Sequence, residues 1–155
     1  MGRVESSIEI KAPVGRMFAF LSNPKNQEKI FARADLKVEN VSEQPIGVGT
    51  TYRTSAVLAG RKADFHPHEF VEFEKNRRFV DRDNGGPLKK EEFTFAFATT
   101  ESGTKLTTTI DCELPYSVLG KILDKLTFRK EFGRFLNGGA QKAKEILYTD
   151  GQEKI

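Results

Sequence analysis

Apolar and polar residues alternate along most of the first 114 positions, and this alternation predicts β-strands. In the first such segment, 4–11, Ile8 and Ile10 share one side. Strict alternation is typical of strands with one buried face. Short connections rich in turn residues, such as 84–87 (Asn-Gly-Gly-Pro), favour antiparallel neighbours. Further strands are expected at 36–43, 50–59, 62–74, 77–83, 89–99 and 105–114.

Two short helices are expected between the first and second strands. Pro13 suits the first helical position, and residues 14–21 place apolar side chains on one face. The run 22–24 (Ser-Asn-Pro) ends this helix and caps a second one that reaches about Phe31. Strands, two short helices and a C-terminal helix together define an α+β protein.

Phe70 breaks the alternation of the strand around it, because it lies on the opposite side from Phe73. A bulge or bend near Pro67 would restore the pattern, since proline in a strand favours an edge or a bulge. The pattern leaves open whether Glu69 or Glu72 faces the interior.

The segment 114–148 predicts a helix longer than a small domain needs. Its apolar stripe is bulky at the start and small in the middle, where Gly133, Gly138, Gly139 and Ala140 cluster. Small residues at the centre of a helix across a sheet would leave space beneath it, and that space suits an apolar molecule. The stripe consists of Leu119, Ile122, Leu126, Gly133, Leu136, Ala140, Ala143 and Leu147. We expect one domain, 1–148, and a frayed tail, 149–155.

Composition supports a single folded domain. Of 155 residues, 37% are hydrophobic and 30% are charged, as in ordinary globular proteins. No run approaches the roughly 20 apolar residues of a membrane span, and the N-terminus lacks a secretory signal. The single cysteine, Cys112, excludes an internal disulfide and suits a reducing compartment, so we expect a cytoplasmic protein.

The net charge of +3 is concentrated on the long C-terminal helix. Its outer face is most simply solvated, but it could also contact an anionic membrane surface. Nucleic acid is not an expected partner, because no aromatic residues interleave with the cations to stack on bases. The cations are Lys121, Lys125, Arg129, Lys130, Arg134, Lys142 and Lys144, and the anions are Asp124, Glu131 and Glu145.

Several short motifs resemble those of the START-like, or helix-grip, superfamily. The closest resemblance is to its polyketide cyclase/dehydrase and lipid-transport group, near a carbon monoxide dehydrogenase subunit that belongs to this group. The motifs are 8–14 followed by 17–21, Asn23-Pro24, 48–50, 72–79 and 103–107. The resemblance implies a curved, antiparallel seven-stranded sheet wrapped round the long C-terminal helix, with an apolar tunnel between them.

These features favour binding or transport of a small hydrophobic ligand, such as a lipid, isoprenoid, quinone or polyketide-like molecule, without a cofactor. Aromatic and aliphatic side chains would form the wall, and a few hydroxyls would orient the polar end. Whether the protein is also an enzyme stays open. The expected ligand-binding residues are Tyr52, Thr54, Phe93, Phe95, Thr108, Ile110, Phe132, Leu136 and Ala140.

The alternative is a cyclase- or dehydrase-type enzyme that uses an inward carboxylate or tyrosine. Burial would raise the pKa of a carboxylate at Glu69, Glu72 or Glu91 and create a general acid or base. Alternation favours the outward orientation for all three. Cys112 shares a face with Ile110 and is interpreted as a buried apolar residue rather than a nucleophile.

His66 and His68 are the only histidines, and their spacing places them on the same strand face. Such a pair could bind a divalent metal with Glu72 or Asp64 nearby. No third ligand stands out in the sequence, and Pro67 suggests a sheet edge. We therefore expect surface histidines and no metal site.

Overall fold

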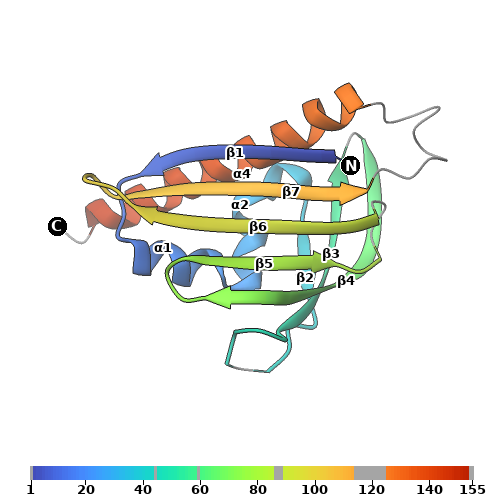
Figure 1. The fold of residues 1–155 in the computed structure, drawn as a ribbon, viewed down its shortest axis with the longest axis horizontal. Helices are drawn as coiled ribbons and strands as arrows, with labels where there is room; N and C mark the ends of the chain where they lie inside the picture. Colours follow the sequence, from blue (N-terminus) through green and yellow to red (C-terminus); the bar gives the residue numbers. More distant parts are fainter. Residues whose placement is uncertain (1, 44, 59, 86–88, 114–124, 154–155) are drawn as a thin grey trace.

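A curved antiparallel sheet with helices on one side forms the molecule (Figure 1). The computed structural model describes all residues except 1, 44, 59, 86–88, 114–124 and 154–155. The elements in chain order are β1 (Gly2–Ile10), α1 (Val14–Leu21), η1 (Pro24–Asn26), α2 (Gln27–Ile30), η2 (Ala32–Ala34), β2 (Lys37–Glu39), β3 (Thr51–Leu58), β4 (Arg61–Glu74), β5 (Arg78–Asp83), β6 (Lys89–Thr99), β7 (Thr104–Glu113) and α4 (Lys125–Glu153).

The seven strands follow the order β1-β7-β6-β5-β4-β3-β2, and every neighbouring pair is antiparallel. The meander expected from the sequence is therefore confirmed for β2 to β7. β1 closes the sheet against β7, in continuous register from Gly2 opposite Cys112 to Ile10 opposite Thr104. In the view of Figure 1, α4 runs behind β1 and β7.

Two irregularities in strand pairing flank Pro67 and explain the broken alternation of β4. The β3–β4 register shifts between Thr54 and Ala56, and the β4–β5 register shifts between Phe70 and Glu72. After the second shift Phe73 joins Phe70 in the same hydrophobic core, as the expected bulge requires.

The main core lies between the concave face of the sheet and α1, and phenylalanines dominate it. Phe79 is fully buried and stacks on Phe95 with ring centroids 4.6 Å apart. Phe18 of α1 meets Phe79 and Phe97 edge-on, at 5.8 and 5.3 Å. These pairs hold α1 against the sheet, since aromatic pairs of this geometry add to the free energy gained by burial.

The described part of the long helix buries a stripe of Phe128, Phe132, Leu136, Ala140, Ala143 and Leu147. Phe128 and Phe132 pack with Val4 and Ile110 in a second core cluster. The first part of the expected helix, including Leu119 and Ile122, lies outside the described residues. At its other end α4 continues to Glu153, past the boundary at Tyr148 predicted from the sequence.

The small residues in the middle of α4 have different surroundings. A Cβ at Gly138 would have no neighbour within 4 Å, so this position faces open space. At Gly139 the ring of Phe31 occupies the place of a side chain. The space predicted around these glycines is therefore open at Gly138 and filled at Gly139. No helix in the described part of the chain is long and apolar enough to cross a membrane.

Candidate functional site

A groove lies between α4 and the segment formed by α2 and η2. Its volume is about 770 Å³, within the range of small-molecule sites. Ile30, Phe31 and Ala34 contribute buried apolar surface, and Val57 and Phe135 contribute half-buried surface. The groove therefore has an apolar lining.

Charged side chains surround this lining and are mostly exposed. Arg33 and Arg134 lie on opposite sides of the groove, one from η2 and one from α4. Arg134 also faces Glu131 at 3.8 Å, and Lys142 faces Glu145 at 3.7 Å. Three cations and two carboxylates thus border the groove, so its rim is slightly basic.

Three phenylalanines separate the groove from the interior of the protein. Phe31 and Phe135 stack with centroids 4.2 Å apart and planes 11° apart. Phe93 of β6 meets both rings, at 6.0 and 6.3 Å. Because Phe93 also stacks on Phe95 at 4.6 Å, these rings connect the groove lining to the core.

The nine residues expected to bind ligand lie inside the protein, and the groove lining includes none of them. Phe93 is half-buried and the others are buried. Ile110, Phe132 and Leu136 pack in one cluster, whereas Tyr52 and Phe95 belong to the main core. Direct contact between any of the nine and a ligand stays a prediction.

A cluster of polar side chains lies on the concave face of the sheet, at the same level on four neighbouring strands. Tyr52 of β3 is opposite His68 of β4, His68 is opposite Asp83 of β5, and Asp83 is opposite Glu91 of β6. Residues directly opposite one another share a face of the sheet, so the pairing register itself assembles the cluster.

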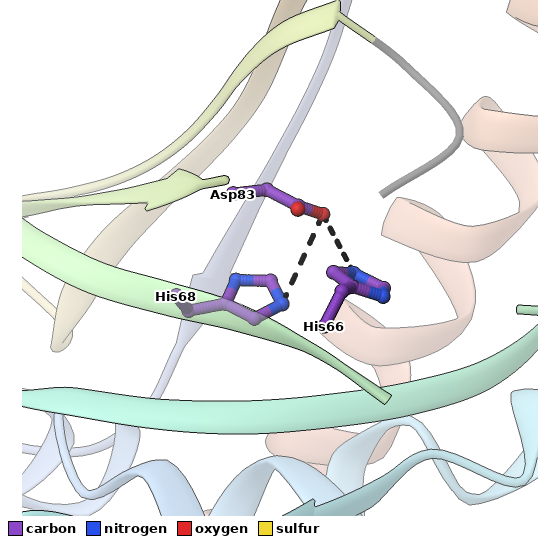
Figure 2. Close-up of side chains that lie close together, drawn as sticks. All are labelled: His66, His68 and Asp83. Carbon is purple, nitrogen blue, oxygen red and sulfur yellow. Dashed lines mark ion pairs between the residues drawn. The ribbon is translucent and has the colours of Figure 1, made fainter. Parts of the chain in front are cut away.

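His66 and His68 belong to this cluster, and the expectation of surface histidines is wrong. His66 Nε2 lies 2.8 Å from Asp83 Oδ2, and His68 Nε2 lies 3.8 Å from the same oxygen (Figure 2). His66 is buried and His68 is half-buried. The reason is that β3 pairs with His66, Pro67 and His68, that β5 pairs from His68 onward, and that the backbone N–H of Asn84 donates to the Pro67 carbonyl, so Pro67 does not mark a free sheet edge.

A chain of hydrogen bonds fixes the inner part of the cluster. Gln27 Nε2 donates to the Tyr52 hydroxyl at 3.0 Å, and this hydroxyl donates to Asp81 Oδ2 at 2.6 Å. Asp81 also accepts from His68 Nδ1 at 3.0 Å. The Thr54 hydroxyl lies 2.7 Å from His68 Nε2. Buried polar groups with this many partners are held in one arrangement.

Burial and mutual charge separate the pKa values of the carboxylates. Burial raises the pKa of Glu91 well above its usual value, and the charge of Asp83 adds to this effect. Burial alone would raise the pKa of Asp83, but the hydrogen bond with His66 and the nearby His68 shift it downward. Burial and the charge of Asp81 raise the pKa of Tyr52 well above its usual value. The pKa values of these two neighbouring carboxyl groups are therefore shifted in opposite directions, upward for Glu91 and downward for Asp83.

The three candidate glutamates have different positions. Glu72 is exposed and pairs with Arg78 at 2.9 Å, as alternation favours. Glu69 is half-buried. Glu91 is in the cluster and hydrogen-bonds Asp83, so the outward orientation is wrong for this residue. The bulge between Lys89 and Glu92 adds one residue to β6 relative to β7, so alternation along the sequence does not show which face of the sheet Glu91 is on.

Sequence analysis missed Asp81, Asp83 and Gln27 as members of the cluster. The signal for the two aspartates was present, because Phe79, Asp81 and Asp83 are spaced two apart on β5 and share the face of a core phenylalanine. Gln27 had no such signal, since its contact with Tyr52 depends on how α2 packs against the sheet.

Among solved structures, the START superfamily protein from Mycobacterium smegmatis covers 96% of this chain and 99% of its own, with a TM-score of 0.77 and 12% identity. The chain has the START-like helix-grip fold. Another helix-grip match, TTHA0849 from Thermus thermophilus, has a TM-score of 0.72 and 22% identity over 91% of this chain and 96% of its own. No family model and no curated protein matches the sequence.

A third structure with this fold is the di-domain ARO/CYC StfQ from the steffimycin biosynthetic pathway. Its TM-score is 0.78 at 13% identity. It covers 97% of this chain, and the match takes in 52% of the StfQ chain. At such low identities the helix-grip likeness concerns the fold alone.

Proposed function

We propose that the protein binds a small, mainly hydrophobic molecule in the groove between α4 and the α2–η2 segment. The groove, with its volume of about 770 Å³ and its apolar lining, is the observation that carries this proposal. Covering about 300 Å² of apolar ligand surface would contribute on the order of 7 kcal/mol before the costs of binding. Relatives in fold support the choice, because they include a START superfamily protein and a polyketide ARO/CYC protein.

The charged rim suggests the chemistry of the other end of the ligand. Arg33, Arg134 and Lys142 border the groove, and a carboxylate, sulfonate or phosphate on the ligand would lie near them. Lipid, isoprenoid, quinone and polyketide-like molecules remain the candidate classes. We place this carrier in the cytoplasm, because its one cysteine is a buried thiol.

Gly138 provides a sharp test, since it lines the groove and a Cβ at this position would have no protein atom within 4 Å. The probe is 8-anilinonaphthalene-1-sulfonate, which combines an apolar ring system with one anionic group. We expect Gly138→Trp to weaken probe binding at least tenfold, while the matched control Gly138→Ala binds within about twofold of the wild type. Circular dichroism checks that both variants are folded.

Equal affinity of the folded tryptophan variant and the wild type would refute the groove as the binding site. Mass spectrometry of an organic extract from natively purified protein then identifies the natural ligand. If the extract contains a stoichiometric molecule although Gly138→Trp leaves binding unchanged, the carrier function stands and the site moves to the interior.

A cyclase- or dehydrase-type enzyme is the second candidate, favoured by the buried Tyr52 and by the half-buried Glu91 in the polar cluster. Both groups are already hydrogen-bonded to aspartates of the cluster, so binding is the better supported proposal. Loss of turnover with retained ligand binding in Glu91→Gln would favour the enzyme, and unchanged turnover would exclude Glu91 as its acid or base.

A further inference from the structure

The polar cluster includes a second site, separate from the groove. One ring nitrogen of His66, one ring nitrogen of His68 and a carboxylate oxygen of Asp83 all lie within 4.8 Å of one another. Figure 2 shows the three side chains converging from β4 and β5. None of the three lines the groove.

In each of the two imidazole rings, the hydrogen bond made by Nδ1 determines whether Nε2 of a neutral ring carries a proton or a lone pair. His66 Nδ1 lies 2.8 Å from the backbone carbonyl of Asp64, which only accepts, so Nδ1 carries a proton and donates. His68 Nδ1 lies 3.0 and 3.1 Å from the two carboxylate oxygens of Asp81 and donates in the same way. In a neutral imidazole the other nitrogen, Nε2, then holds a lone pair.

The two Nε2 atoms lie near one carboxylate oxygen of Asp83. His66 Nε2 is 2.8 Å from Asp83 Oδ2, a contact that either a proton on Nε2 or a metal ion can bridge, and His68 Nε2 is 3.8 Å from the same oxygen. Glu91 brings a further carboxyl group to Asp83. Two imidazoles and a carboxylate around one point form a donor set that binds transition-metal ions.

We propose that His66, His68 and Asp83 bind one divalent transition-metal ion, with zinc as the reference metal. Zinc bonds to histidine nitrogen and carboxylate oxygen are about 2.0 to 2.2 Å long, so three ligands within 4.8 Å of one another need only small side-chain adjustments. The Thr54 hydroxyl, 2.7 Å from His68 Nε2, would release that nitrogen when the ion binds.

The surrounding hydrogen bonds support the metal rather than a proton alone. Metal-binding histidines usually donate a hydrogen bond from their second ring nitrogen to a carboxylate or a backbone carbonyl. Here His68 donates to the Asp81 carboxylate and His66 donates to the Asp64 carbonyl. The Tyr52 hydroxyl donates a hydrogen bond to Asp81, and Asp81 in turn orients the ring of His68. A single imidazolium–carboxylate pair of His66 and Asp83 would not need the second oriented ring.

The test uses protein without a histidine tag, stripped with a chelator and titrated with zinc chloride by isothermal calorimetry. We expect one zinc ion per chain in the wild type. Asp83→Asn and His68→Gln should weaken binding about a hundredfold or more, and Asp81→Asn about 10- to 100-fold through loss of the hydrogen bond to His68. Asp111→Asn is the matched control, because Asp111 is a half-buried carboxylate on β7 that pairs with Arg3.

A second measurement needs no variant and therefore does not depend on folding of the mutants. The imidazole nitrogen NMR signals of the wild type are recorded before and after zinc is added, and the Nε2 signals of both rings should shift. Stoichiometric binding with shifted Nε2 signals supports the site. Absent binding, unshifted signals, or equal affinity of a folded Asp83→Asn variant would overturn it, and doubly protonated rings unaffected by zinc would indicate a proton between the charges instead.

Discussion

The ring of Phe31 lies against the backbone of α4 at Gly139, in the space that a side chain at that position would need. The same ring stacks on Phe135 one turn earlier in α4. Phe31 thereby joins the end of α2 to the middle of the long helix, and the apolar lining of the groove depends on this contact.

Gly139→Ala should therefore destabilise the protein. The added methyl group meets the Phe31 ring, and overpacking of this kind costs about 1–3 kcal/mol, more than the roughly 0.5–1 kcal/mol gained by replacing glycine in a helix. Urea denaturation measures the free energy of unfolding. Gly138→Ala is the control, one residue away with no neighbour within 4 Å, and it should gain stability. An equal gain in both variants would contradict the close contact between Phe31 and Gly139.

Tyr52→Phe should cost about 1–3 kcal/mol of folding free energy, since it leaves Gln27 and Asp81 each without a hydrogen-bond partner that they have in a buried site. The measurement is again urea denaturation, with the slope compared to confirm a common unfolding transition. Ser7→Ala serves as the control, because its hydroxyl bonds Thr107 on the exposed side of the sheet. If Tyr52→Phe lost no more unfolding free energy than Ser7→Ala, the buried hydrogen bonds of Tyr52 would not contribute to the stability of the fold.

Cys112 should resist thiol reagents in the folded protein. Burial, together with the nearby charge of Glu91, raises the pKa of its thiol from 9.0 to about 12, so little thiolate is present near neutral pH. We expect slow reaction with a disulfide reagent in buffer and fast reaction in guanidinium chloride. Rapid modification of folded protein would contradict this burial.

The same shift in the Cys112 pKa predicts a dependence of stability on pH. The folded state holds the thiol neutral, whereas the unfolded chain ionises above 9.0, so the contribution of Cys112 is complete below 9.0 and is lost as pH rises toward about 12. Across this window the wild type should lose more unfolding free energy than Cys112→Ala, measured by urea denaturation at each pH. Parallel losses would exclude the thiol as a source of the alkaline decline.

Several parts of the fold could be predicted from the sequence because they depend on local patterns. Alternation identifies a strand and the residues that share its face, as it does for Phe93, Phe95 and Phe97 of β6. The glycine-rich and proline-rich turns allow only short connections, so successive strands must pair antiparallel. Helical periodicity similarly identified Leu136, Ala140, Ala143 and Leu147 as the buried stripe of α4.

The candidate sites depend on contacts between segments that are distant in the sequence, and local alternation and periodicity do not predict such contacts. The pair His66–His68 was visible in the sequence, but its third partner, Asp83, reaches it only through the register of β4 with β5. That register contains a shift between Phe70 and Glu72, and a slip by one residue would move Asp83 to the other face of the sheet. The sequence also placed the ligand space beneath the small centre of α4, whereas the groove lies beside that centre, because Phe31 fills the space at Gly139.

The sequence by itself thus determined the order of the elements and their antiparallel connections, because side-chain periodicity and turn chemistry act over a few residues. Only the tertiary structure decided that Tyr52, His68, Asp83 and Glu91 form one row across four strands and that α2 meets α4 along a groove. Strand register and helix docking are set by the packing of the whole core, so they depend on residues far apart in the chain.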